Sequence, residues 1–214
     1  MSKDCVVIQG PTHDQERMSK AWEGFNVIYS TWDDEKPKGE IPNNFVYNEK
    51  PKDAGFRNIN YQVTSTLSGL KKAKKDGFDF CLKWRSDYVP SNATNLFKMF
   101  DKKALNFIAW SNHDGGYLID YFFAGKTDYL IQIFEKMREL EKTCQHNFPE
   151  QKLTMATREL VEKKCIKPNY LLNKFDDSNY CTFIRPGDDY NTSNVVWQKD
   201  LHWQNDLTEG NRWA

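Results

Sequence analysis

The chain lacks the features that mark several large classes of protein. It contains no Cys-x-x-Cys pair, and its five cysteines are widely spaced and odd in number, which argues against a zinc site and favours a reducing compartment. No apolar stretch approaches the roughly 20 residues of a membrane span, and no signal peptide opens the chain. We therefore expect a cytoplasmic protein without a transmembrane segment.

Charge and glycine patterns argue against further classes of ligand. Thirty basic residues balance thirty acidic ones, so the formal net charge is zero and nothing indicates a nucleic-acid partner. No Gly-x-Gly-x-x-Gly follows the first apolar run, which counts against a dinucleotide-binding Rossmann domain. The same loop, Gln9-Gly10-Pro11-Thr12-His13, has neither the extra glycines nor the lysine that a nucleotidyltransferase would usually carry.

The composition that remains is that of one folded domain. The 214 residues are 39% hydrophobic and 14% aromatic, and they contain no repetitive or Gly/Ser-rich stretch. Residues 210–214 show no obvious stop, which is compatible with the N-terminal domain of a longer protein.

Short apolar runs alternate with segments of helical spacing, which predicts an α/β fold. A strand at 5–8, a helix at 13–22 and a strand at 25–32 form a βαβ unit and therefore indicate a parallel sheet. Further strands are expected at 45–47, 80–84, 107–110, 117–125 and 182–185. Further helices are expected to open at 53–60 and to cover 95–100, 127–142 and 153–161.

The strand at 80–84 runs directly into the charged triplet Arg85-Ser86-Asp87. Ligands of open α/β sheets bind beyond the carboxyl ends of the strands. A carboxylate delivered there by a rigid strand suits a hard metal ion that holds phosphates. The alternative is that Asp87 only caps a turn before Pro90.

Two other polar features need an explanation. Asp120 is a charge inside an apolar strand, so it must be paired or functional, and a structural ion pair is the alternative. Arg57, Asn60 and Gln62 cluster at the start of a helix, where backbone N–H groups favour an anion. For these residues the alternative is capping and exposure to solvent.

A set of short motifs gives the chain a resemblance to a known family. The helix 60–70 with Gly69, followed by a strand that ends in Arg85-Ser86-Asp87, resembles the nucleotide-sugar half of GT-A glycosyltransferases. The set resembles the WavE-type lipopolysaccharide-synthesis glycosyltransferases more closely, including the N-terminal domain of capsid-glycosylating enzymes of large algal viruses. The motifs are Val7-Ile8-Gln9-Gly10-Pro11, Ser30-Thr31-Trp32, Asp53-Ala54-Gly55, Gly69-Leu70 and Lys83-Trp84-Arg85-Ser86-Asp87.

The resemblance implies a GT-A-like, Rossmann-like sheet that is mostly parallel and flanked by helices. It divides the single domain into a nucleotide-sugar half, 1–110, and an acceptor half, 111–214. It also implies a UDP-sugar donor, a glycan or glycoprotein acceptor, and Mn²⁺ or Mg²⁺. If the chain is viral, the compartment would be the host cytoplasm.

The resemblance also implies roles for individual residues. Asp87 matches the last Asp of the family's Asp-x-Asp motif and would bind the metal, whereas Arg85 stands where the first Asp is usual and would face a phosphate. His202 is a candidate second metal ligand. The nucleotide site would comprise Gln9, Gly10, Pro11, Ser30, Thr31, Trp32, Arg57, Asn60, Arg85 and Ser86.

These residues predict a metal-dependent glycosyltransferase. Asp87 would act through the metal that stabilises the leaving phosphate. Asp120 would take the proton of the acceptor hydroxyl, with Asp114 and Glu150 as weaker candidates. The alternative is a non-catalytic module of a larger protein that binds a nucleotide sugar or a glycan.

Overall fold

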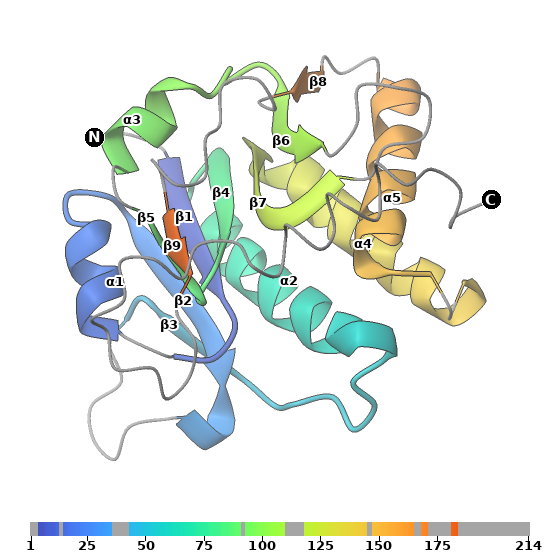
Figure 1. Cartoon of the computed structure of the whole chain (residues 1–214), viewed down its shortest axis with the longest axis horizontal. Coiled ribbons are helices and arrows are strands. Elements are labelled where there is room, and N and C mark those ends of the chain that lie inside the picture. The colour runs from blue at the N-terminus through green and yellow to red at the C-terminus, as the bar shows by residue number, and fades with distance from the viewer. Residues whose placement is uncertain are drawn as a thin grey trace.

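The centre of the molecule is a seven-stranded sheet with the order β3-β2-β1-β4-β7-β6-β8 (Figure 1). The computed structural model describes residues 4–12, 15–35, 43–90, 93–109, 118–144, 147–164, 168–170 and 181–183. The strands are β1 (Asp4–Gln9), β2 (Val27–Trp32), β3 (Phe45–Asn48), β4 (Phe80–Arg85), β6 (Leu105–Ala109), β7 (Leu118–Lys126) and β8 (Pro168–Tyr170).

The sheet is mixed but mostly parallel, which confirms the predicted fold class at that level. β1 pairs in parallel with β2 and β4, β2 with β3, and β6 with β8. Only β7, among the described strands of this sheet, runs the other way, antiparallel to both β4 and β6. A separate two-stranded sheet joins β5 (Tyr88–Pro90) to β9 (Cys181–Phe183).

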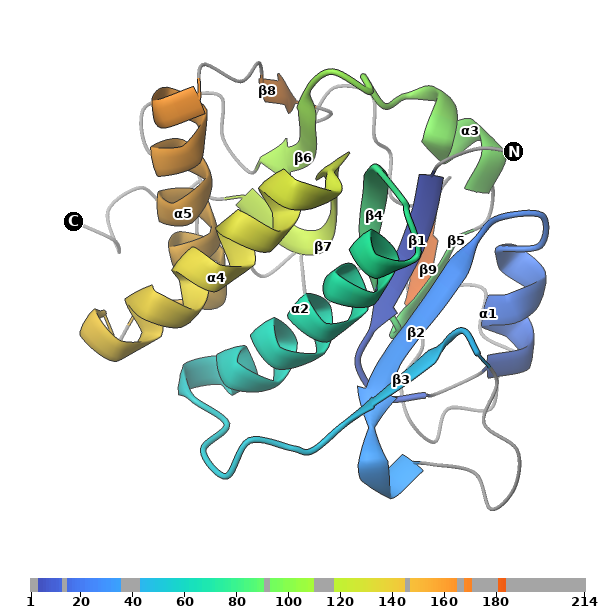
Figure 2. The same ribbon diagram turned by 180° about the vertical axis from the view of Figure 1, so that it is seen from behind.

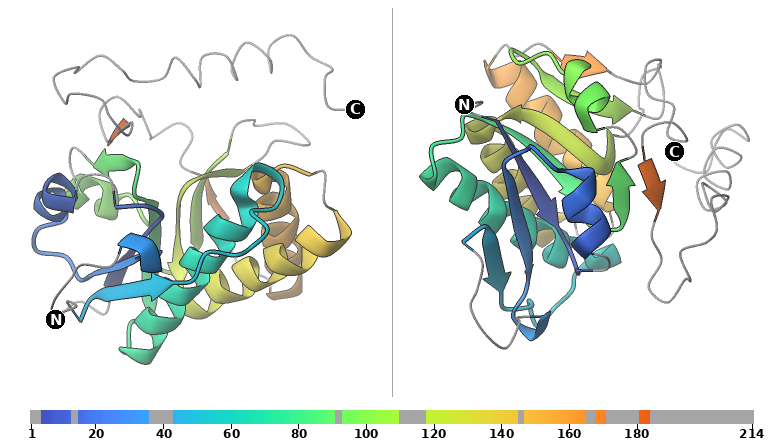
Figure 3. Two further views of the ribbon diagram at one scale, coloured as in Figure 1. Left: turned by 90° about the horizontal axis from the view of Figure 1, so that it is seen from below. Right: turned by 90° about the vertical axis from the view of Figure 1, so that its left-hand side faces the viewer.

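Helices cover both faces of the sheet. One face carries α2 (Ile59–Lys75), α4 (Thr127–Thr143) and α5 (Pro149–Lys164), seen in front of the strands in Figure 2. The other carries α1 (Gln15–Ala21), α3 (Ala93–Lys98) and the small sheet, and the right-hand view of Figure 3 shows the layers from the side. No described helix combines the length and apolarity needed to cross a bilayer.

The alternation of side chains along β1 builds the two halves of the core. Val7 belongs to the cluster beneath α2, α4 and α5, whereas its neighbour Ile8 packs with Met18 and Trp22 on the other face. Successive side chains of a strand point to opposite faces. Because both faces of β1 are covered, the strand is apolar without interruption from Cys5 to Ile8, as in buried parallel sheets.

The strand order reverses direction between β1 and β4. From β1 the chain adds β2 and β3 on one side of the sheet and then returns to place β4 on the other side. Such a switch point opens a crevice outside the carboxyl ends of the two strands. This edge is the lower one in Figure 1, and the left-hand view of Figure 3 looks onto it.

The helix expected to open at 53–60 begins at Ile59, near the end of that range. A short 3-10 helix, η2 (Phe56–Asn58), precedes α2, and Arg57 and Asn58 have φ angles of 55° and 62°. Left-handed backbone is less unfavourable for Asn than for Arg, but at either residue it cannot continue a right-handed helix. The regular helix therefore starts at Ile59.

Candidate functional site

The first part of the site is a row of residues across the ends of three strands. Ser30, Gln9 and Arg85 lie in register on β2, β1 and β4. The turn after β4 is joined to β1, because the Ser86 N–H donates to the Gln9 carbonyl at 3.0 Å. Gly10 has a φ of 114°, and a Cβ at this position would lie 2.7 Å from Ser86 Oγ, so this close approach requires glycine.

A shallow pocket lies beside this row, and its empty space of about 280 Å³ includes open solvent. The lining residues from the predicted nucleotide site are Gly10, Pro11, Ser30, Thr31 and Ser86. Ile8, Thr12, Gln15, Met18 and Tyr29 complete the lining. The residues predicted for the nucleotide site come from three separate segments of the chain, and these segments line one concave surface.

Two predicted nucleotide residues turn their side chains toward α2. Gln9 Oε1 accepts a hydrogen bond from Ser65 Oγ at 2.9 Å, and Ser30 Oγ accepts one from Asn48 Nδ2 at 3.0 Å. Both side chains are buried. Trp32 is also buried and contacts Tyr61 edge-on, with 5.4 Å between ring centroids. The side chains of these three residues therefore pack inside the protein at the ends of the strands.

Glu35 joins the loop after β1 to the end of β2. It is the last residue of η1 (Asp33–Glu35). Its Oε2 accepts hydrogen bonds from the Thr12 N–H at 2.6 Å, from Thr12 Oγ1 at 2.8 Å and from Thr31 Oγ1 at 2.6 Å. The carboxylate thereby fixes two walls of the pocket relative to each other.

The second part of the site is a charged cluster centred on Arg85. Its Nε and Nη2 donate to the two oxygens of Asp87, at 2.9 and 2.5 Å. Its Nη1 lies 3.2 Å from Asp120 Oδ1. One guanidinium therefore bridges the two carboxylates that the sequence singles out, and Asp120 is paired, as a charge in an apolar strand must be.

Asp120 lies just outside the part of β7 that pairs with β4, in which Phe122 is opposite Trp84. It is 8% exposed and also accepts a hydrogen bond from Gln62 Nε2 at 2.6 Å. Lys83, which is fully buried, donates to the backbone carbonyl of Asp120. Helix α2 and strands β4 and β7 therefore meet at this residue.

The pKa values of the ionisable groups in and near the cluster are shifted in different directions. Burial lowers the pKa of Lys83 to about 8, although the charge of Asp120 opposes this shift. For Asp120, burial alone would raise the pKa, but the charges of Arg85 and Lys83 outweigh it and keep the pKa below its ordinary value. Glu150, in the first turn of α5, has its pKa raised to about 7 by burial and then by the negative charge of Asp120.

Arg57 and Asn60, expected at the nucleotide, lie in η2 and in the first turn of α2. The Arg57 guanidinium lies over the rings of Phe56 and Phe148, at 5.9 and 5.4 Å from their centroids. Asn60 Nδ2 donates to the Asp53 carbonyl at 3.2 Å and helps to close the loop.

Two residues were predicted to bind a metal ion, and Asp87 is the one that lies within the described part of the chain. No group of three or more His, Cys, Asp or Glu side chains suited to a metal ion occurs in the described part of the chain. The other expected ligand, His202, lies outside the described residues, and so does the candidate base Asp114. A hard cation that is held mainly by substrate phosphates needs only one or two carboxylates, so the oxygens of Asp87 fit such an ion.

Several residues of the site were given no role from the sequence. Lys83 is part of one motif but was assigned no function, although it interrupts an apolar strand, which is the same signal that identifies Asp120. Glu35 follows the end of a strand, where carboxylates often bind ligands or fix loops. Ser65 offers no signal, because a buried helical serine is as common in cores as in sites.

Neither the known protein families nor the curated proteins include a match to this chain.

Proposed function

We propose that the protein is a metal-dependent glycosyltransferase with a GT-A-like fold that uses a UDP-sugar. The observation that carries the proposal is the meeting of an open pocket and a charged cluster at the switch point between β1 and β4. The acceptor would be a glycan or glycoprotein, such as a viral capsid glycan or a surface polysaccharide. The reaction breaks the bond between the anomeric carbon and the phosphate oxygen and forms one to an acceptor oxygen.

The pocket is the proposed seat of the nucleoside. It is lined by apolar side chains, including Tyr29 and Met18, and by Gly10. Glu35 holds the loop around it and, as an anionic acceptor, suits the hydroxyls of a ribose. Ser86 lines both this pocket and the turn that leads to the cluster, so a diphosphate would extend from one to the other.

Asp87 is the proposed metal ligand, and Arg85 faces the diphosphate. A bound Mn²⁺ or Mg²⁺ would supply positive charge for the leaving phosphate. The pairing of Arg85 with Asp87 keeps both charges compensated in the free protein. A guanidinium fork is well suited to exchange a carboxylate for phosphate oxygens. The guanidinium would keep its ion pair with Asp120 during that exchange, so Arg85 would remain in place.

Two carboxyl groups are candidates for taking the proton of the acceptor hydroxyl. Asp120 accepts hydrogen bonds from Gln62 and Arg85, and its low pKa makes it a weak base. Glu150 has a pKa of about 7, close to the value that general acid–base catalysis favours. We therefore assign the proton to Glu150 and give Asp120 the role of positioning Arg85.

One observation favours the alternative of a non-catalytic nucleotide-sugar-binding module. Both carboxylate oxygens of Asp87 are engaged by Arg85, and Arg85 replaces one acid of the family's motif. A module of this kind would bind UDP through the pocket alone. Metal dependence and turnover distinguish it from the enzyme.

The substitution Asp87→Ala tests the proposal. We expect Mn²⁺ to strengthen UDP binding to the native protein in calorimetry and to support hydrolysis of at least one UDP-sugar in a panel. The variant should lose turnover by about 100-fold or more, because charge stabilisation of the leaving group is lost. Native-like circular dichroism would show that the fold is retained.

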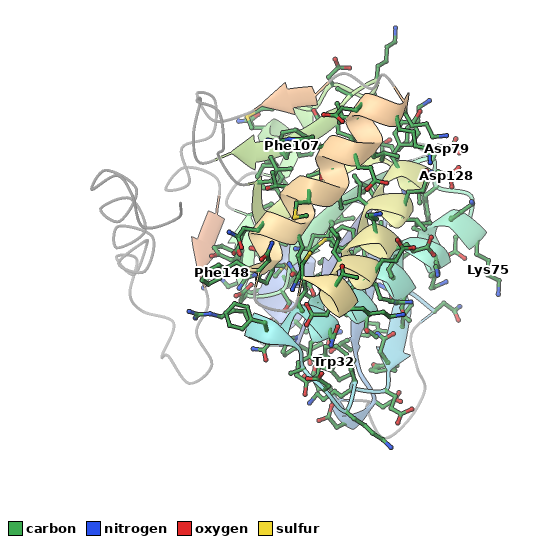
Figure 4. The ribbon with its side chains drawn as sticks, turned by 90° about the vertical axis from the view of Figure 1, so that its right-hand side faces the viewer. Trp32, Lys75, Asp79, Phe107, Asp128 and Phe148 are labelled. Carbon is green, nitrogen blue, oxygen red and sulfur yellow. The ribbon has the colours of Figure 1, made fainter. Side chains whose placement is uncertain are left out.

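Asp79→Ala is the matched control, since Asp79 is an exposed aspartate at the other end of the same strand. Figure 4 shows it beside Asp128, far above Trp32 at the end of β2. The control should behave as the native protein. The binding module would be established instead if UDP affinity depended neither on Mn²⁺ nor on Asp87 and if no donor were turned over.

A further inference from the structure

An exposed aromatic surface lies where the helices α2 and α5 begin. We define the aromatic platform as Phe56, Arg57 and Phe148. The two phenyl rings meet edge-on with 5.3 Å between centroids, and the Arg57 guanidinium lies over both. Phe56 is 38% exposed. Among the described residues the other exposed large apolar side chain is Met155, which accepts a hydrogen bond from Asn147 next to Phe148.

Each half of the platform is tied to a residue of the cluster. Arg57 lies two residues before α2, whose first turn brings Gln62 to Asp120. Phe148 directly precedes α5, whose first turn contains Glu150. The Phe148 carbonyl accepts the Lys152 N–H at 3.1 Å, and its N–H donates to Gln151 Oε1 at 2.8 Å. The platform therefore lies at the starts of the two helices that carry Gln62 and Glu150.

A buried ion pair holds the two halves together. Lys152 of α5 has no exposed surface and pairs with Glu141 of α4. The other oxygen of Glu141 accepts the Phe56 N–H at 3.4 Å. A loop held in this way keeps an exposed phenyl ring and two left-handed residues in a fixed position. Figure 4 shows Phe148 on the other side of the helical layer from Lys75, Asp79 and Asp128.

We propose that the aromatic platform binds a pyranose ring of the acceptor glycan. This proposal depends on the glycosyltransferase function proposed above. A sugar ring has an apolar C–H face that packs on a phenyl ring and a rim of hydroxyls that accept hydrogen bonds from a guanidinium. Phe148 is two residues before Glu150 at the start of α5, so an acceptor bound on the platform would be held near that carboxyl group.

The test uses the whole chain and a panel of methyl pyranosides in saturation-transfer NMR, with UDP and Mn²⁺ present. We expect at least one pyranoside to bind the native protein and its affinity to fall about tenfold in Phe56→Ala and in Phe148→Ala, the loss expected for one aromatic contact. Phe56→Tyr should restore binding because it keeps the ring. Phe97→Ala, which truncates a half-buried ring packed near Trp22 on the opposite face, controls for general loss of stability.

UDP affinity, measured by calorimetry on the same variants, separates this proposal from the one before. Unchanged UDP affinity with lost pyranoside binding supports the platform. Failure of every pyranoside to bind a protein that does bind UDP and Mn²⁺ overturns it while the donor site stands. A dimer that dissociates in Phe56→Ala would also overturn it, because the surface would then be an interface between two copies. Absence of UDP binding in the native protein would instead contradict the proposed function.

Discussion

Asp120 and Glu150 show how neighbouring carboxyl groups acquire opposite properties. Asp120 is paired with Arg85 and receives a hydrogen bond from Gln62, so its charged form is favoured in spite of burial. Glu150 is half-buried near that charge, so its neutral form is favoured. Environments that separate two pKa values in this way assign one group to hold charge and the other to exchange a proton.

The exchange of a proton at Glu150 predicts a pH profile. Because the base must be ionised, kcat/KM for transfer should rise tenfold per pH unit below about 7 and level off above it. Glu150→Gln should lower the rate by about 10²- to 10⁴-fold at the plateau, with UDP binding unchanged. Steady-state kinetics across this pH range checks both statements.

Glu159→Gln is the control for this change. It makes the same substitution on the same helix, at an exposed residue that pairs with Lys136 on the surface. Its profile should match the native one. If Asp120→Asn abolished the acidic limb and Glu150→Gln retained it, the roles of the two carboxyl groups would be reversed.

Single residues could be predicted from sequence where a charge interrupts an apolar pattern. Asp120 was identifiable in this way, and its pairing is confirmed. Lys83 gives the same signal within β4, yet its meaning depends on a partner from β7 that is 37 residues away. Arg85 and Asp87 are two residues apart at the end of a strand, so both could be expected at the site but their mutual pairing could not.

At the scale of elements, the close packing of α2 on the sheet depends on one glycine. A Cβ at Gly69 would lie 2.4 Å from Val7 Cγ1 and 3.1 Å from Ser30 Cβ. The backbone of α2 therefore approaches β1 and β2 directly. This approach brings Ser65 to Gln9 and Gln62 to Asp120 from the same helix.

Gly69→Ala should destabilise the protein even though alanine is the better helix former. Helix propensity favours alanine by about 1 kcal/mol, but overpacking against a stiff, buried valine costs about 1 to 3 kcal/mol. We expect a net loss of free energy of unfolding, measured by urea denaturation. UDP affinity should fall as well, because α2 would move away from the strand ends.

Ser68→Ala tests the same helix without the steric conflict. Ser68 is only partly buried, so this neighbouring change should leave stability and UDP affinity close to native. A stability of Gly69→Ala equal to that of Ser68→Ala would mean that α2 does not lie as close to the sheet as described.

The elements themselves were largely predictable, and their ends were not. Apolar runs identified β1, β2 and β4, and helical spacing identified α2 and α4, since burial on a sheet imposes those periods. α2 starts at Ile59, within the predicted 53–60, but the left-handed backbone of Arg57 and Asn58 just before it was not predicted. The platform formed there with Phe148 depends on contacts between distant segments.

At the scale of the whole molecule, the order of the strands decides where the site lies. Alternating strands and helices predict a parallel sheet, but not that β4 returns beside β1 or that β7 inserts antiparallel between β4 and β6. That insertion brings Asp120 to Arg85 and places the carbonyl of Asp120 over Lys83. The assembled sheet therefore buries a lysine that no local pattern requires.

Burial of Lys83 should make the stability of the whole protein depend on pH. Its pKa is about 8 in the folded state and 10.5 ordinarily, so between these values the unfolded chain binds more protons. The free energy of unfolding should therefore rise with pH across this window, by on the order of 3 kcal/mol from this group. The measurement is urea denaturation from pH 7.5 to 10.5.

Other groups titrate in the same range, so the comparison is with Lys83→Met, which keeps a long unbranched side chain. The difference between native and variant stability should shift in favour of the native protein as the pH rises and the buried charge is lost. Lys103 is exposed, so the variant Lys103→Met should show the same dependence of stability on pH as the native protein. Parallel curves for the native protein and Lys83→Met would mean that Lys83 titrates as it does in the unfolded chain, and that water reaches it beneath Asp120.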